Sequence, residues 1–146
     1  MNKIMKFRGQ CISPKYEDEC MYLKMIVGDL KEEYGDYFIK YEGEWYKVKK
    51  DTISIYTGIN NCFQGDILKR INTKNNKPSF EKSFGVIQKE KETNNLIFKW
   101  YNYNEFLNKF NDVEILPLKS IKYYANVGNI YENKKLLCNI NIEDDN

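Results

Sequence analysis

Residues 36–49, DYFIKYEGEWYKVK, decide the fold class predicted for this chain. On both sides of the pair Glu42-Gly43, bulky apolar and aromatic residues alternate with other side chains. Alternation with a period of two is typical of a strand with one buried face, and two such runs joined by two residues that include glycine predict a β-hairpin. We therefore expect an antiparallel pair formed by residues 36–41 and 44–49.

The second strand of this hairpin also combines aromatic and basic residues. Trp45, Lys47 and Lys49 alternate with Tyr46 and Val48, so one face is predicted to be both aromatic and basic. This face has two possible interpretations. Such a face can stack and bind single-stranded nucleic acid, or the aromatic rings belong to the core while the lysines face water.

Further short strands and two helices are predicted along the chain. The other strands are expected at residues 4–8, 21–27, 52–57, 67–71, 84–88, 96–101 and 123–131. In the strand at 52–57, Ile53 and Ile55 are expected to face inward and Ser54 outward. One helix is expected from the N-cap Asn104 to Phe110, and a shorter one is expected at residues 134–138 after Asn133.

The composition supports a strand-rich domain of ordinary size. The chain has 146 residues, 15% of them aromatic, and Ala125 is the only alanine. Alanine has the highest helix propensity, whereas tyrosine, isoleucine and phenylalanine favour strands. We therefore predict a mainly β single domain over residues 1–146, as a small barrel or strongly curved antiparallel sheet with one or two peripheral helices.

The polar composition bears on catalysis and metal binding. The chain has no histidine, which removes imidazole-based mechanisms and histidine metal ligands. The cysteines are Cys11, Cys20, Cys62 and Cys138, and no two of them form a CxxC pair. The acidic clusters at residues 17–19, 32–33 and 144–145 are contiguous, which does not suit paired acid–base catalysis. We predict a non-enzymatic protein with no metal and no cofactor.

The location and the class of partner follow from charge and hydropathy. The net charge of +2 is too balanced to indicate a nucleic-acid or membrane partner by itself. No apolar run suits a signal peptide or a membrane helix. We expect a cytoplasmic protein with free thiols and no membrane partner.

Three segments carry a family resemblance: KFRG at residues 6–9, YTGI at 56–59 with FQGDI at 63–67, and VGNIYEN at 127–133 with two leucines at 136–137. In their order and placement they resemble the YopX family of phage and prophage proteins. The resemblance implies a small β-rich protein of a phage or mobile element, in the cytoplasm of its bacterial host. It implies no catalytic residue.

The same motifs have a physical interpretation. Gly58, Gly65 and Gly128 are expected in tight turns or close backbone approaches. Asp66 is expected to accept hydrogen bonds from turn amides rather than to act in catalysis.

The predicted function is therefore binding, most of all to a host protein, for example a host-defence component that the protein would antagonise. Tyrosine and tryptophan are enriched at the energetic centres of protein interfaces. The alternative is binding of single-stranded nucleic acid or of a nucleotide, and a homo-oligomer is also expected. The candidate surface residues are Tyr41, Trp45, Lys47, Lys49, Trp100, Tyr101, Tyr123 and Tyr124.

Overall fold

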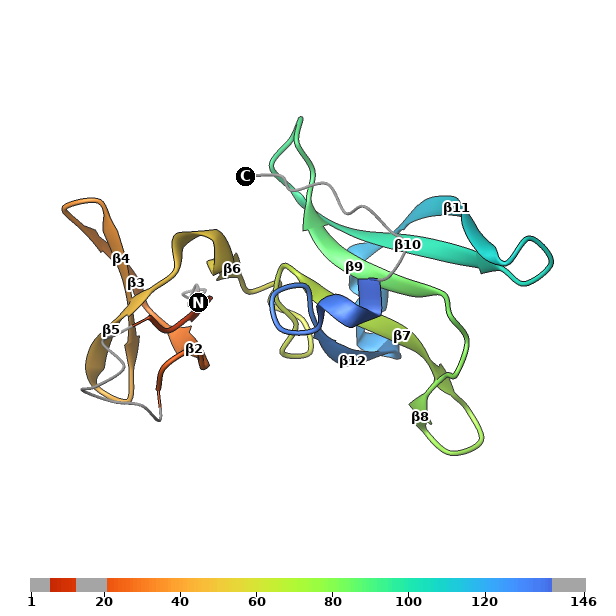
Figure 1. Cartoon of the computed structure of the whole chain (residues 1–146), viewed down its shortest axis with the longest axis horizontal. Helices are drawn as coiled ribbons and strands as arrows, with labels where there is room; N and C mark the ends of the chain where they lie inside the picture. Colours follow the sequence, from red (N-terminus) through yellow and green to blue (C-terminus); the bar gives the residue numbers. More distant parts are fainter. Residues whose placement is uncertain (1–5, 13–20, 138–146) are drawn as a thin grey trace. The chain divides into compact units, whose positions relative to one another are not determined.

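The computed structural model describes residues 6–12 and 21–137 (Figure 1). Its contacts divide into two compact units, unit 1 (Met1–Tyr56) and unit 2 (Thr57–Asn146). Unit 1 contains β1 (Phe7–Gln10), β2 (Met25–Gly28), β3 (Leu30–Glu33), β4 (Asp36–Tyr41), β5 (Glu44–Val48), the 3-10 helix η1 (Lys50–Thr52) and β6 (Ser54–Ile55). Unit 2 contains β7 (Asp66–Asn72), β8 (Lys77–Pro78), β9 (Phe84–Lys89), β10 (Leu96–Asn104), β11 (Lys109–Leu116), η2 (Leu118–Tyr123), β12 (Tyr124–Asn129) and η3 (Lys134–Leu137).

Unit 1 has two three-stranded antiparallel sheets, in the orders β2-β1-β6 and β3-β4-β5. The hairpin predicted at residues 36–49 is confirmed, because β4 and β5 pair antiparallel around Glu42 and Gly43. Both turn residues have positive φ, 49° and 86°, as a type I′ turn requires. Ile39 and Val48 point from this hairpin into a core that also contains Cys11.

The neighbouring strand β3 was not predicted from the sequence. Its sequence, LKEE, has a single apolar residue, Leu30, so it shows no alternation. The turn after β3 brings this strand beside β4, and its residues Tyr34 and Gly35 have φ values of 51° and 83°. This second two-residue turn pairs β3 with β4 along its whole length.

Unit 2 is built on a six-stranded antiparallel sheet in the order β11-β10-β9-β7-β12, in which β8 pairs with β7. Successive side chains of a strand point to opposite faces, so each central strand supplies two separate cores. The first core consists of Cys62, Leu68, Ile87, Phe98, Trp100 and Ile121, the last of these from η2. The second consists of Ile67, Phe84, Val86 and Tyr101, with Leu137 of η3 packed against it.

Most of the strands predicted in unit 2 are present. The strands expected at residues 67–71, 84–88, 96–101 and 123–131 correspond to β7, β9, β10 and β12, with ends that differ by a few residues. The shorter helix after Asn133 is the 3-10 helix η3, and Cys138 lies outside the described residues.

The helix predicted from Asn104 to Phe110 is wrong, because this segment is the turn of the β10–β11 hairpin. The side-chain oxygen of Asn104 does accept a hydrogen bond from the Leu107 backbone N–H (3.0 Å), but the bond closes a turn and no helix follows. Asn108, with a φ of 52°, then directs the chain back. Phe110 packs on the sheet beside Tyr103, with ring centroids 5.0 Å apart. The spacing of the aromatic residues resembled a helical face only by coincidence.

The strands of unit 1 are shorter than expected or shifted. The first strand is β1, and Ile4 and Met5 lie outside the described residues. The strand predicted at 21–27 begins only at Met25. The strand predicted at 52–57 is reduced to β6, and Ser54, expected to face outward, is fully buried. The Ser54 hydroxyl donates to the Thr52 carbonyl (3.2 Å), which lowers the cost of burying it.

The fold class is thus mainly β and antiparallel, as predicted, and the helices of the described residues are short 3-10 helices. A closed barrel is wrong for the described part of the chain, where the strands form three sheets and the largest has β11 and β12 at its open edges. The described residues divide into two compact units, each with a core or cores of its own. The described residues contain no helix that could cross a membrane.

Candidate functional site

The predicted aromatic and basic face exists in unit 1. Trp45 and Lys47 lie on the side of the β3-β4-β5 sheet that faces away from the core, together with Lys31 and Phe38. Trp45 is 39% exposed, and the Lys31 ammonium lies 4.4 Å from the centroid of its ring. Tyr41, in contrast, is half-buried against the core.

Acidic neighbours offset much of the positive charge on this face. Lys31 forms an ion pair with Glu33 and Lys47 forms one with Asp36, each with an N–O distance of 3.4 Å. Lys49, which follows β5, is exposed. A polyanion would have to compete with these carboxylates, so the face is a weak site for phosphate groups.

The residues predicted in unit 2 do not form one surface. Trp100 and Tyr101 were expected to be exposed, and this is wrong: their exposed fractions are 0% and 5%. They belong to opposite faces of a sheet that is covered on both sides, so alternation placed both of them in cores. Tyr124 packs against Trp100, with ring centroids 5.4 Å apart. Of this group only Tyr123, 67% exposed, lies on the surface.

The glycine-containing motifs of unit 2 form a structural junction. Asp66, 1% exposed, accepts hydrogen bonds from the Phe63 backbone N–H and from the Asn126 side-chain amide, both at 2.8 Å. The prediction that Asp66 binds a turn amide is therefore confirmed. The Gly65 carbonyl accepts a hydrogen bond from the Ile130 N–H (2.9 Å), which joins the turn before β7 to the turn after β12.

Asn133 has a different role from the predicted helix cap. Its side-chain oxygen accepts a hydrogen bond from the backbone N–H of Asn129 (3.0 Å). A β-carbon on Gly128 would overlap this oxygen, so the motif needs glycine here for close approach. These motifs serve the architecture of unit 2.

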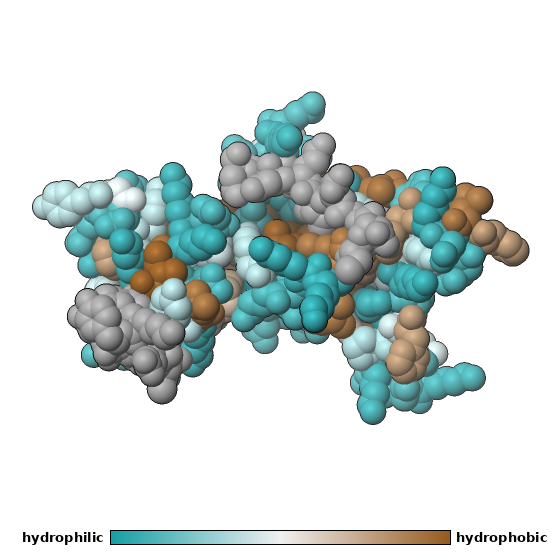
Figure 2. Space-filling view, viewed as in Figure 1, coloured by the Kyte–Doolittle hydropathy of each residue, from teal (hydrophilic) through white to brown (hydrophobic). Residues whose placement is uncertain are grey.

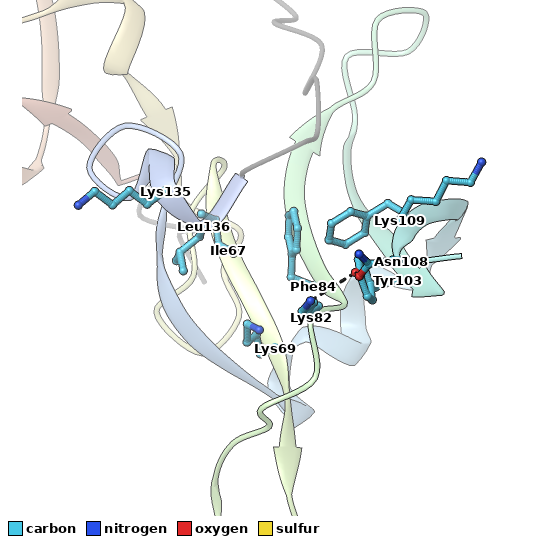
Figure 3. A pocket seen from close by; sticks show the side chains of 10 residues that line it. Ile67, Lys69, Lys82, Phe84, Tyr103, Asn108, Lys109, Lys135 and Leu136 are labelled. Atoms are coloured by element: carbon cyan, nitrogen blue, oxygen red, sulfur yellow. Dashed lines mark hydrogen bonds between the residues drawn. The ribbon is translucent and has the colours of Figure 1, made fainter. Parts of the chain in front are cut away.

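A pocket of about 860 Å³ lies on the second face of the unit 2 sheet, beside η3 (Figure 3). Its size is within the range of small-molecule sites. Apolar and aromatic side chains form part of the lining: Ile67, Phe84, Tyr103, Phe110 and Leu136. The polar part of the lining consists of Lys69, Lys82, Asn108, Lys109 and Lys135.

The aromatic rings of the pocket are held in fixed orientations. Phe110 makes edge contacts with Phe84 and with Tyr103, at centroid distances of 5.6 and 5.0 Å. The backbone N–H of Tyr103 donates to the Ser83 hydroxyl at 2.9 Å, and the Tyr103 hydroxyl donates to the Asn108 side-chain oxygen. Rings fixed in this way provide a preformed platform for a planar ligand.

Four lysines from four segments of the chain line the pocket, and Figure 3 shows that the ammonium groups of Lys109 and Lys135 extend outward from it. Lys82 lies over the Tyr103 ring, with its ammonium 4.6 Å from the centroid and 3.3 Å from the hydroxyl oxygen. The Lys69 ammonium donates to the backbone carbonyl of Glu81 at 2.6 Å. No aspartate or glutamate is among the described residues that line the pocket. The charged side chains among the described lining residues are all lysines, which suit an anion that carries a flat ring.

The four lysines of the pocket were not predicted from the sequence. Lys69 lies in β7, Lys82 lies just before β9, Lys109 begins β11 and Lys135 lies in η3, so no local pattern connects them. Of the lining residues, only Tyr103 belongs to a segment that shows the aromatic and basic pattern, FKWYNY at residues 98–103. The pocket arises because the sheet order places β7, β9 and β10–β11 side by side.

Metal chemistry finds no support in the described residues, where no three histidine, cysteine, aspartate or glutamate side chains are grouped to hold an ion. The acidic clusters at residues 17–19 and 144–145 lie outside the described residues. Comparison of the chain with family models, with curated proteins and with solved structures gave no match.

Proposed function

We propose that the protein binds single-stranded nucleic acid without catalysis, and that the lysine-lined pocket of unit 2 is the binding site. The observation that carries the proposal is one pocket lined by Lys69, Lys82, Lys109 and Lys135 together with fixed aromatic side chains, with the Lys82 ammonium over the Tyr103 ring. Proteins that bind single strands combine a positive groove for the phosphates with rings on which bases stack. The pocket offers both elements on one face of one sheet.

Charge distinguishes this pocket from the aromatic face of unit 1. On that face Lys31 and Lys47 have carboxylate partners. In the pocket, the Lys69 ammonium donates to a backbone carbonyl and the Lys82 ammonium donates to a phenol, and neither of these acceptors is an anion. Phosphates would therefore gain more from the pocket lysines than from those of unit 1.

The test is fluorescence anisotropy of a labelled twelve-nucleotide oligo-dT and the corresponding oligo-U at low salt. We expect measurable binding of the unmodified protein and a loss of at least tenfold in affinity for the double variant Lys82→Glu, Lys109→Glu. Thymidine monophosphate, used as a competitor, tests whether a single nucleotide fills the site. If the monophosphate competes at concentrations near the Kd of the oligomer, the pocket binds a single nucleotide and the rest of the strand adds little affinity.

Lys119→Glu is the matched control. Lys119 is an exposed lysine of η2, whose Ile121 packs on the opposite face of the same sheet. The charge change is the same in sign and type, so a general electrostatic effect would weaken binding in both proteins. No binding at low salt, or equal losses per charge changed in the pocket variant and in Lys119→Glu, would contradict the proposal.

A host protein is the second candidate partner, favoured by the exposed apolar residues of edge strand β11. Val113 and Ile115 are 46% and 57% exposed on a strand that ends the sheet in the described part of the chain. Edge strands offer unpaired backbone groups to another chain. The variant Val113→Lys, Ile115→Lys should lose a protein partner captured by the unmodified chain while keeping oligonucleotide binding. Light scattering of both proteins tests whether the partner is a second copy.

The family and its biology remain predictions. Membership of a YopX-like phage or prophage family, action in the bacterial cytoplasm and antagonism of host defence would all agree with either partner. A gene neighbourhood made up of phage genes would support the predicted origin, and a housekeeping operon would count against it.

A further inference from the structure

The turn of the β10–β11 hairpin carries two exposed apolar side chains. Phe106 is 99% exposed and Leu107 is 55% exposed. Figure 2 shows apolar colour where this hairpin projects, at the right of the view, on a surface that is otherwise largely hydrophilic. A side chain this exposed contributes almost nothing to the core, and two adjacent ones form an exposed apolar patch of the kind that marks an interaction site.

Hydrogen bonds on both sides hold this turn in shape. The Asn104 side-chain oxygen accepts from the Leu107 N–H (3.0 Å) at its start. At its end, the Asn108 side chain accepts a hydrogen bond from the Tyr103 hydroxyl, while Asn108 itself has a φ of 52°. Phe106 is therefore presented from a fixed turn, which lowers the entropy cost of using it in binding.

The turn is continuous with the lysine-lined pocket. Asn108 and Lys109, which follow Phe106 closely, both line the pocket, as does Tyr103 on the opposite strand. Two residues of extended chain span at most about 7 Å, so the Phe106 backbone lies within that distance of Asn108. A strand with a phosphate held by Lys82 in the pocket would have a neighbouring base within reach of the Phe106 ring.

We infer that Phe106 is a stacking site for a base of the bound strand just outside the pocket. The inference rests on the proposed function, since it extends the same strand from the pocket to the hairpin turn. The expected partner is a nucleobase because Lys82 and Lys109, which line the adjoining pocket, suit phosphate, and because every base offers a flat face to a phenyl ring. Leu107 would contact the sugar or the edge of the same base.

The experiment compares oligo-dT with an oligomer of equal length whose backbone lacks bases. Phe106→Ala should weaken oligo-dT binding by between about 5-fold and 100-fold, the range expected for loss of one stacked base. Affinity for the baseless oligomer should not change, because its phosphates meet the same lysines. Phe106→Trp should restore affinity for oligo-dT, because it restores a flat ring.

Tyr34→Ala is the matched control. Tyr34 is another exposed aromatic at a hairpin turn, 104% exposed with a φ of 51°, but its neighbours include Glu33 and Asp36. We expect this variant to bind both oligomers as the unmodified protein does. Equal affinity of Phe106→Ala and the unmodified protein for oligo-dT would overturn the inference while leaving the pocket intact. If instead Lys82→Glu, Lys109→Glu binds oligo-dT normally, the pocket itself is wrong.

Discussion

Asp66 and Asn126 are joined by a hydrogen bond of 2.8 Å from the asparagine amide to the buried carboxylate, across 60 residues of sequence. The same carboxylate oxygen accepts the backbone N–H of Phe63. The bond therefore joins the turn before β7 to β12, at the edge of the unit 2 sheet. Two sequence motifs that stand far apart in the chain are one structural element.

Removal of the Asp66 carboxylate should destabilise unit 2. Asp66→Ala leaves the Phe63 N–H and the Asn126 amide without this acceptor in a site that is 1% exposed. We expect the free energy of unfolding to fall by about 2–4 kcal/mol, measured by urea denaturation. Asp112→Ala, at an exposed position of β11, should change it by no more than about 0.5 kcal/mol.

The two tryptophans should differ sharply in solvent access. Trp45 is 39% exposed, whereas Trp100 is fully buried between Phe98 and Tyr124. In Trp45→Phe the remaining fluorescence should therefore be blue-shifted and resist quenching by acrylamide. Strong quenching of this variant would show that Trp100 is not in the core. The same variant also lets urea unfolding of unit 2 be followed through Trp100 alone.

Gly85 in β9 should not tolerate a methyl group. A β-carbon there would overlap the Phe98 ring and lie 2.9 Å from the Trp100 ring, and both rings are fully buried. Gly85→Ala should cost about 3 kcal/mol of unfolding free energy, because the rings have no free space to move into. Adding Phe98→Leu should recover part of that loss; a double variant no better than the sum of the two single changes would show that the clash is not the cause.

The affinity for oligo-dT should fall with salt in proportion to the lysines engaged. For a single-stranded nucleic acid, each phosphate contact contributes about −0.7 to the slope of log affinity against log salt concentration. Four lysines line the pocket, so a slope between about −2 and −3 is expected. Lys82→Gln should make the slope about 0.7 less steep, and Lys119→Gln should leave it unchanged. A slope near zero would exclude phosphate contact.

Local sequence patterns predicted the structure correctly where the interacting residues are close in sequence. The hairpin around Glu42 and Gly43 was predictable because alternation and turn conformation act over a few residues. The segment from Asn104 to Phe110 was wrongly predicted to be a helix, because an asparagine side chain can accept the same hydrogen bond at a helix start and in a hairpin turn. Only the pairing of β11 with β10 decides between them.

Burial of the aromatic side chains could not be predicted from alternation alone. Trp100 and Tyr101 are adjacent in β10, and one of them would face water if the sheet had one covered face. Here η2 packs on one face and η3 on the other, so both residues are buried. Trp100 and Tyr101, two of the candidate surface residues, are therefore buried by elements outside β10.

By itself, the sequence determined an antiparallel, mainly β chain, its main hairpins and the turn-binding role of Asp66, because each depends on contacts between near neighbours. The division into two units, and the meeting of four lysines from separate segments with aromatic rings in the lining of one pocket, depend on tertiary contacts. The physical reason is that strand order sets which distant residues meet, and strand order follows from burying both faces of the sheet at once.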